Sequence, residues 1–405
     1  MELQGIEVLK NNLSRKRNRV NLRYDYYEMK NFTRYFSKLM PSEYAWLSHA
    51  LGWCGRTVDA LADRLSVYNF RNDNFRMQEI YAQNNSDVLF DSAILSALIS
   101  SCSFIYISVR DGFPTMQVID GSKATGIIDD VTNMLSEGYA ILEEDNNHIP
   151  TLEAYFEPGR TTYYERGKEP YSIEYNCPYP LLVPIIYRPD AKRPFGHSRI
   201  TRACMSIQDS AIRTLKRSEV AAEFYAFPQK YILGMEEDAE FNNRAATMST
   251  FLRIDKDSEG DRPVIGQFTQ STMQPYIDQL RAYASLFGAE SGLTLDDLGF
   301  PSQNPSSAEA IKASHENLRL SCRKAQKTFS TGFINAGYLA RCILDDVPYE
   351  RKMIYETSVS WEPIFEPDSG MLSAIGDGVL KINQAMPDYV NAETLREMTG
   401  IIHYE

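Results

Sequence analysis

One short stretch of the sequence has the residue types for nucleophilic chemistry. Gly196, His197 and Ser198 place a histidine beside a serine directly after a glycine. A nucleophile elbow, however, needs a second glycine after the serine, and no carboxylate or second histidine stands at a motif spacing from this pair. We therefore expect no catalysis here. Pro194 and Gly196 interrupt the chain, and Ser198 is predicted to be the N-cap of a helix that follows.

The other residues that could bind metals or cofactors are scattered. His49 and Cys54 are five positions apart, a poor ligand spacing on a helix, and are predicted to be structural. The sequence lacks CxxC, HExxH, a phosphate loop and GxGxxG. We expect no metal site, no cofactor and no catalytic residue. The six cysteines are expected to be buried, reduced thiols: Cys54, Cys102, Cys177, Cys204, Cys322 and Cys342.

The net charge of −12 argues against a protein that wraps DNA, because phosphate binding depends on lysine and arginine. It does not argue against a protein past which DNA slides without sticking. A basic cluster, Arg15 to Arg19, falls near the end of a helix expected over residues 3–20. It fits either a solvated face near a helix C-terminus or a contact with nucleic acid or a partner. The sequence lacks a signal peptide and a run of about 18 apolar residues, so we expect a soluble protein inside the cell.

The first half of the chain predicts helices followed by an antiparallel sheet. Apolar helices are expected over residues 44–65 and 87–100. Short segments rich in β-branched and aromatic residues follow, separated by turn pairs such as Asp111-Gly112 and Pro158-Gly159. The predicted strands are residues 102–109, 115–119, 139–143, 151–156, 160–164 and 171–175. The acids at 143–145 are expected in a loop.

The second half predicts long helices around a small hairpin module. A helix is expected over 198–227, with Arg213, Lys216 and Arg217 on its polar face. A short helix at 241–249 precedes a hairpin of residues 251–254 and 263–268, whose acidic tip includes Asp255, Lys256, Asp257 and Glu259. Another helix covers 273–286, and a Gly/Pro/Ser/Asn-rich break covers 291–307.

The longest predicted element runs from Asn304 to Leu344. Ser306 and Glu309 form a capping box at its start, and apolar residues then recur at three- and four-residue steps. No proline interrupts the stretch between Pro305 and Leu344, so one helix of roughly 60 Å is expected at 1.5 Å per residue. A strand near 356–365 and helices at 369–386 and 391–398 end the chain. A hairpin at the tip of two long helices leaves those helices thinly covered in a single copy. Ring assembly with closed symmetry covers them.

Three stretches in this order resemble the portal proteins of tailed bacteriophages. They are YDYYEMKNFTRYFSKLMP with WCGRTVDALADRL, then VPIIYRPDAKRPFGHSRITRACMSIQDSAIRTLKRSEVAAEFYAFPQKYILG, then LDDLGFPSQNPSSAEAIKASHENLRL. The resemblance spans roughly residues 24–400. It implies an α+β, portal-like fold assembled as a ring. Its parts would be N-terminal helices and wing (1–195), stem helix 1 (196–227), clip (228–269), stem helix 2 (270–290), tunnel loop (291–305), long wing helix (306–345), and C-terminal wing with a short crown (346–405).

The resemblance also implies function. Such a protein forms a homo-oligomeric, usually dodecameric ring at one capsid vertex of the virion, after assembly in the host cytoplasm. It is a conduit for double-stranded DNA during packaging and ejection. It contacts the major capsid and scaffold proteins, and its clip docks the large terminase and later the head-tail adaptor. The packaging ATPase would be a separate partner, no membrane is involved, and the short crown puts crown-related functions in doubt.

The resemblance places candidate contacts on three elements. Phe300, Ser302, Gln303 and Asn304 would touch DNA from the tunnel loop. Arg213, Lys216 and Arg217 would lie near the channel or a subunit interface, with a solvated helix face as the equal alternative. The hairpin tip would belong to the clip. Two other functions stay open: an intracellular carbohydrate- or nucleotide-acting enzyme built on the aromatic, acidic sheet, and a neck or adaptor protein, although those chains are usually much shorter.

Overall fold

The computed structural model describes residues 3–30, 49–129, 131–226, 230–233, 264–267, 272–301, 308–365, 367 and 369–401. The chain divides into two compact units. The first comprises Met1–Asn31, Gly52–Met205 and Gly288–Glu405, and the second Phe32–Leu51 and Ser206–Phe287. Helices α5 (Arg202–Ala226) and α7 (Gln274–Ser291) carry the chain from one unit to the other.

The first unit is built on two antiparallel sheets. The smaller has the order β3-β2-β9 and the larger the order β4-β5-β6-β7-β8. The strands are β2 (Cys102–Arg110), β3 (Phe113–Asp120), β4 (Ala124–Ile128), β5 (Leu135–Glu144), β6 (Pro150–Glu157), β7 (Arg160–Glu165), β8 (Tyr171–Glu174) and β9 (Leu182–Ile186). All six predicted strands are therefore confirmed, and β4 and β9 are additional.

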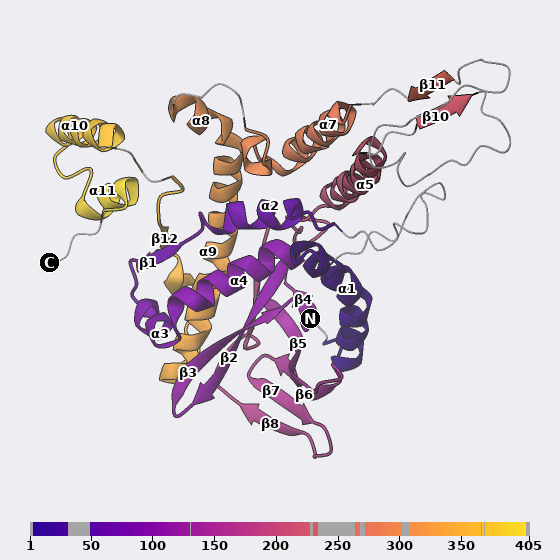
Figure 1. Ribbon diagram of the computed structural model, residues 1–405. Helices are drawn as coiled ribbons and strands as arrows, with labels where there is room; N and C mark the ends of the chain where they lie inside the picture. Colours follow the sequence, from indigo (N-terminus) through magenta and orange to yellow (C-terminus); the bar gives the residue numbers. More distant parts are fainter. Residues whose placement is uncertain are drawn as a thin grey trace, which may run out of the picture. The chain divides into compact units, whose positions relative to one another are not determined.

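Helices α4 (Ser86–Ser100) and α9 (Glu316–Asp345) pack on the same face of the smaller sheet (Figure 1). Ser103 donates a hydrogen bond to the Ala93 carbonyl of α4 at 2.7 Å. Its cross-strand partner Ile185 lies under Gly332 of α9, where an added Cβ would come within 2.6 Å of the Ile185 side chain. Both helices carry many apolar residues because the side of each helix that packs on the sheet is buried.

The opposite face of the smaller sheet packs on the larger sheet through aromatic residues. Tyr106 of β2 contacts Phe156 of β6 with ring centroids 5.5 Å apart, and its hydroxyl lies 2.7 Å from that of Tyr163. Many of the sheet's tyrosines are therefore buried packing groups and do not line an open groove.

Helix α1 (Ile6–Tyr27) covers the outer face of the larger sheet (Figure 1). Leu9 and Leu13 pack there against residues of β5 and β6. The buried carboxylate of Glu137 accepts the backbone N–H groups of Gln4 and Gly5 at 2.8 and 3.1 Å, which fixes the start of the helix.

The basic cluster of α1 has structural roles, and the helix continues past the predicted end at residue 20. Lys16 lies 5.4 Å from the ring centroid of Phe104, and burial lowers its pKa. Arg17 forms an ion pair at 2.6 Å with Glu144, which belongs to strand β5 and not to a loop as predicted. Two of the four basic side chains are thus held by the first unit itself.

The remaining elements of the first unit lie outside the two sheets and the helices described above. They are α2 (Trp53–Ala62), β1 (Val67–Arg71), α3 (Met77–Gln83), the 3-10 turns η2 (Asp296–Leu298) and η3 (Arg351–Ile354), α8 (Ala308–Ser314), β12 (Ser358–Trp361), α10 (Ser369–Ala385) and α11 (Ala392–Thr399). Strands β1 and β12 pair antiparallel. Asn391 caps α11, because its side chain accepts from the Thr394 N–H at 2.9 Å. Of the helix predicted over 44–65, the described part contains only α2.

The described part of the second unit consists of most of α5 and α7 and the hairpin of β10 (Lys230–Leu233) and β11 (Val264–Gln267). Strand β11 confirms the predicted strand at 263–268, but it pairs with β10, which was not predicted. The other predicted strand, 251–254, and the short helix at 241–249 lie outside the described residues. His49 has its structural role here, 2.6 Å from the Glu219 carboxylate.

Candidate functional site

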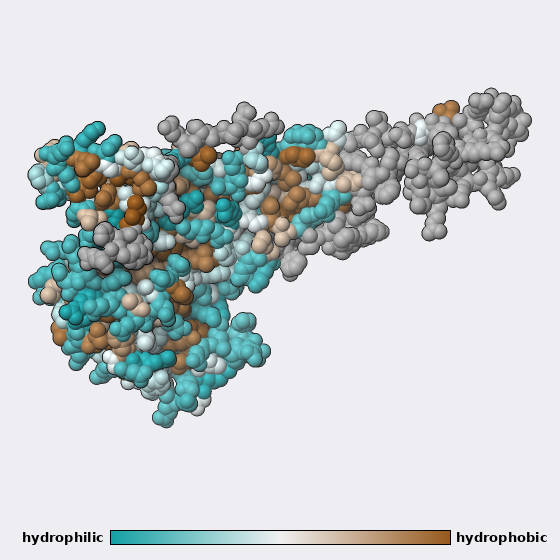
Figure 2. Space-filling model, turned by 60° about the vertical axis from the view of Figure 1, so that its left-hand side comes forward, coloured by the Kyte–Doolittle hydropathy of each residue, from teal (hydrophilic) through white to brown (hydrophobic). Residues whose placement is uncertain are grey.

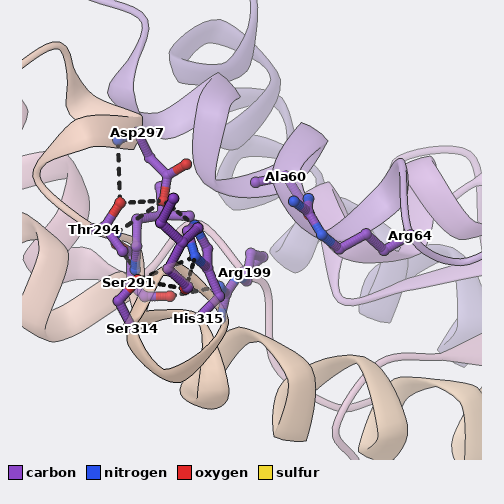
Figure 3. Close-up of polar contacts among 10 residues, drawn as sticks. Ala60, Arg64, Arg199, Ser291, Thr294, Asp297, Ser314 and His315 are labelled. Carbon is purple, nitrogen blue, oxygen red and sulfur yellow. Dashed lines mark hydrogen bonds and ion pairs between the residues drawn. The ribbon is translucent and has the colours of Figure 1, made fainter. Parts of the chain in front are cut away.

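The predicted tunnel loop begins at a junction where α7 ends. The Asp297 Oδ2 accepts from the Thr294 backbone N–H at 2.9 Å and from its hydroxyl at 2.8 Å. The same oxygen lies 3.3 Å from Nε2 of His315, at the other end of the loop segment (Figure 3). Burial by itself would raise the pKa of Asp297, but the Thr294 hydrogen bonds and the nearby charges of His315 and Arg56 outweigh it and hold the pKa below its usual value.

Arg199 holds the end of α7 from below this junction (Figure 3). Its side chain is buried, and its guanidinium donates to the Ser291 carbonyl at 2.5 Å and to the Thr57 carbonyl at 3.2 Å. A charged group that satisfies two buried carbonyls fixes the last turn of α7 to the segment that precedes α5. Thr201, beside it, caps α5, because its hydroxyl accepts from the Cys204 N–H at 3.2 Å.

The long helix predicted from Asn304 to Leu344 is wrong as a single element. It is divided at His315 into α8 and α9. The His315 backbone, with φ −94° and ψ 10°, departs from helical values, and its Nδ1 lies 2.9 Å from the Ile311 carbonyl. The imidazole thus interacts on one side with the end of α8 and on the other with Asp297. The capping serine Ser306 lies outside the described residues.

Of the four predicted tunnel-loop contacts, only Phe300 is among the described residues. Its backbone N–H donates to the Leu295 carbonyl at 2.9 Å, and its side chain is half-buried. Gly299, with φ +88° and open space around its Cβ position, makes the turn that leads out of η2. Ser302, Gln303 and Asn304 lie outside the described residues.

The three basic residues of the first predicted stem helix lie in different environments. Arg217 is exposed, and Arg213 is half-buried and donates to the Ser210 hydroxyl at 2.7 Å. Lys216 was expected on the same open face but is buried, and this burial lowers its pKa. The helix is therefore covered over a wider arc than its apolar residues predicted. The clip-tip residues Asp255, Lys256, Asp257 and Glu259 lie outside the described residues.

The geometry around Ser198 does not support nucleophilic catalysis. Its buried hydroxyl donates to the Ile99 carbonyl at 2.6 Å. The predicted N-cap role of Ser198 is wrong as well, because α5 begins at Arg202 and Thr201 caps it. The His197 imidazole pairs with the Asp190 carboxylate at 2.5 Å and not with the Ser198 hydroxyl. This pairing lowers the pKa of Asp190 to about 2. Among the described residues, no group of three or more His, Cys, Asp or Glu side chains could hold a metal ion.

A cavity of about 510 Å³ lies between the β1–β12 pair and the α10–α11 helices. Trp361 and Leu395 contribute to its apolar lining, and the Arg71 guanidinium pairs with Glu397 at 2.7 Å at its edge. It brings together none of the candidate residues chosen from the sequence. The two helices beside it have no buried residues, and Leu380 is among the apolar side chains that they expose. Brown, apolar surface is visible among the hydrophilic residues on the face shown in Figure 2.

Sequence reasoning missed Arg199, Asp297 and His315, the polar residues that hold the loop junction. The spacing of Thr294 and Asp297 is a local signal for a capped turn, since such side chains bond the backbone of their neighbours. The contact of Asp297 with His315, 18 positions further on, has no local signal. No helix in the described part of the chain is long and apolar enough to cross a membrane.

The chain is an α+β protein in which α5 and α7 flank a small hairpin along the sequence, and in which two facing sheets and the long helix α9 build the first unit. The family model described as "Phage portal protein, SPP1 Gp6-like" matches residues 6–368. The chain belongs to this family. It is a phage portal protein: a component of the virion and the head-tail connector, and not an enzyme, so the carbohydrate- or nucleotide-acting alternative is set aside.

Individual relatives agree with the family. The portal proteins of Mycobacterium phages L5 and D29 are each 25% identical over 351 residues, covering 80% of this chain and 71% of theirs. Among solved structures, a chain from the virion of a native gene transfer agent particle is 13% identical in sequence to this chain, with a TM-score of 0.44. The neck of a native gene transfer agent particle, computed with C12 symmetry, is 12% identical, with a TM-score of 0.46. Each covers 86% of this chain and 90% of the compared chain.

Proposed function

We propose that copies of this chain form a closed, dodecameric ring at one capsid vertex, through which double-stranded DNA is packaged and ejected. Membership of the portal family carries this proposal, because the match covers α5, the hairpin region, α7 and the loop together. In the ring, α5 and α7 form the stem, residues 228–269 the clip, and residues 291–305 the loop that meets DNA. The clip docks the large terminase and later the head-tail adaptor, and the wing contacts capsid and scaffold proteins.

Exposed apolar side chains on α7 support assembly. Apolar side chains along one side of this helix are open over its first turns in a single copy: Ile277 is 49% exposed, and Leu280 and Met273, just before the helix, are half-buried. Further along, Ala284 and Phe287 are fully buried. An apolar helix face that is covered at one end and open at the other suits a neighbouring copy in a ring.

Negative-stain electron microscopy with mass by light scattering tests the assembly. Twelve copies of 46.2 kDa weigh about 550 kDa, and rings with a central hole and this mass are expected. Ile277→Asp should reduce the mass by placing a charge in the interface, whereas the control Val131→Asp, at a position 87% exposed, should keep the ring. A monomer or dimer at all protein and salt concentrations would overturn the proposal. If Ile277→Asp leaves the rings unchanged, α7 is not part of the interface between copies.

Two variants test the placement of function on the ring. Replacing Ser302, Gln303 and Asn304 together by alanine should leave rings intact and lower the number of DNA-filled heads in a phage complementation assay. Charge reversal at Asp255, Asp257 and Glu259 should give normal rings and empty heads if the tip docks the packaging motor. Normal packaging with either variant would refute that assignment and leave the ring itself untouched.

A further inference from the structure

Helix α9 presents a basic face in a protein that is acidic overall. Arg323, Lys324 and Lys327 are exposed on its first half, and none of them forms an ion pair among the described residues. The one acidic residue on this face, Glu316, is neutralised by Arg319, which donates two hydrogen bonds to it at 2.7 and 2.6 Å. Three exposed positive charges that form no ion pair among the described residues therefore remain on a chain whose net charge is −12, although Arg323 also lies close enough to help lower the pKa of Glu316.

These side chains project from one side of the helix. Arg323 and Lys327 are four residues apart and Lys324 and Lys327 three, so neighbouring Cβ atoms are about 5–6 Å apart. The opposite side of α9 carries residues such as Leu318 and Cys322, which are buried in the first unit. The basic stripe, defined here as Arg323, Lys324 and Lys327, is therefore held in a fixed direction by a packed helix.

The stripe begins near the base of the loop. It lies 8–12 residues beyond His315, which corresponds to about 12–18 Å along the helix axis. His315 in turn contacts Asp297 at the opposite end of the loop segment. The stripe therefore starts on the helix that follows His315, about 12 Å along the axis from the base of the loop.

We infer that the basic stripe of α9 binds the phosphate backbone of double-stranded DNA, an inference that rests on the proposed conduit function. Duplex DNA carries one negative charge per about 1.7 Å of axis, so three closely spaced cations match consecutive phosphates without reading bases. An acidic surface of a second copy is the competing partner. The stripe fits that partner less well, because the cores of protein interfaces are depleted of lysine and enriched in aromatic anchors, and Leu320 is the apolar residue exposed on this face.

The test measures how binding depends on salt. A labelled 30-bp duplex of arbitrary sequence is titrated with the full-length protein between 25 and 200 mM salt, and binding is followed by fluorescence anisotropy. The stripe variant is Arg323→Ala/Lys324→Ala/Lys327→Ala. The control variant is Lys168→Ala/Lys352→Ala/Lys381→Ala, which removes three exposed lysines on other elements. Each variant changes the net charge by three, from −12 to −15.

The stripe variant should reduce the slope of log Kobs against log salt by about 2.7, since each phosphate contact contributes about 0.9. The control should keep the wild-type slope. Equal slopes in all three proteins, an equal loss in both variants, or no binding by the wild type would overturn the inference. Particle mass is measured in parallel: a stripe variant that loses its ring but keeps the slope points to the second copy. If the stripe variant forms intact rings and keeps the wild-type slope, the inferred DNA binding by the stripe is refuted, while the proposed ring and conduit function still stands.

Discussion

Removing the charge of Asp297 is expected to loosen the base of the loop. The carboxylate is only about 16% exposed as a side chain, and one oxygen accepts two hydrogen bonds from Thr294 and contacts His315 at 3.3 Å. Asp297→Asn keeps the shape of the side chain but makes these charge-assisted contacts neutral. Hydrogen bonds to charged groups contribute about 1.5–3 kcal/mol, roughly twice the neutral value, so the local free energy of opening should fall by about 1–2 kcal/mol.

Hydrogen–deuterium exchange of the assembled protein measures this effect at the right place. Because about 1.4 kcal/mol corresponds to a factor of ten, amides in peptides covering 293–301 and 311–318 should exchange about 5- to 30-fold faster in Asp297→Asn. The control is Asp296→Asn, which makes the same charge change at the exposed neighbouring position. Exchange within twofold of wild type in both peptides, or an equal effect of the control, would refute the reasoning.

The same carboxylate predicts a pH dependence. Its pKa in the folded protein is lower than in the unfolded chain, where an aspartate has a pKa of about 3.9. Its stabilising contribution is therefore complete above that pH and is lost as pH falls through the lower folded-state pKa. After correction for intrinsic exchange rates, wild-type protection at 293–301 should fall at acidic pH, and the part of that fall due to Asp297 should be absent in Asp297→Asn.

Two further substitutions probe the packing that supports the site. Gly196→Ala should destabilise the first unit by about 2–4 kcal/mol, seen as a lower Tm, because Gly196 has φ +73° and an added Cβ would lie 2.1 Å from the Tyr187 carbonyl oxygen. A Tm within 1 °C of wild type would contradict this. Arg199→Met should also lower Tm, since it leaves the buried carbonyl of Ser291 at the end of α7 unpaired, at about 1–3 kcal/mol, and removes a second hydrogen bond to the Thr57 carbonyl of α2. Arg199→Lys should recover part of the loss, and full stability of the methionine variant would refute the role of the guanidinium.

The sheets were predictable because their signals are local. Strands such as 102–109 and 160–164 alternate or concentrate β-branched and aromatic residues between turn pairs, and each was found where it was expected. Strand β9 was missed because its sequence, LVPII, has a proline that argues against a strand in a sheet, although it pairs along an edge with β2. The division into two facing sheets was not predictable, because it depends on contacts such as Tyr106 with Phe156 that are distant in sequence.

The candidate site was predictable only in outline. The helices before and after the loop follow from apolar periodicity, and the loop itself follows from its glycine, proline and serine content. The break at His315 could not be predicted, because the apolar pattern continues from Ile311 to Leu318 across it. The imidazole interacts there with Asp297, a tertiary contact that overrides local helix propensity.

Polar contacts hold both ends of the loop, so substitutions at its base and substitutions within the loop should cause different defects. Arg199 and the Asp297–His315 contact lie at the base of the loop, so changes there should lower stability as well as function. Ser302, Gln303 and Asn304 are polar residues in a segment rich in turn-forming residues. Substitutions at those positions should leave Tm and ring mass unchanged and alter DNA passage alone. If loop and base variants instead fall together in stability and packaging, the loop is part of the folded core and its proposed role as a separate DNA contact fails.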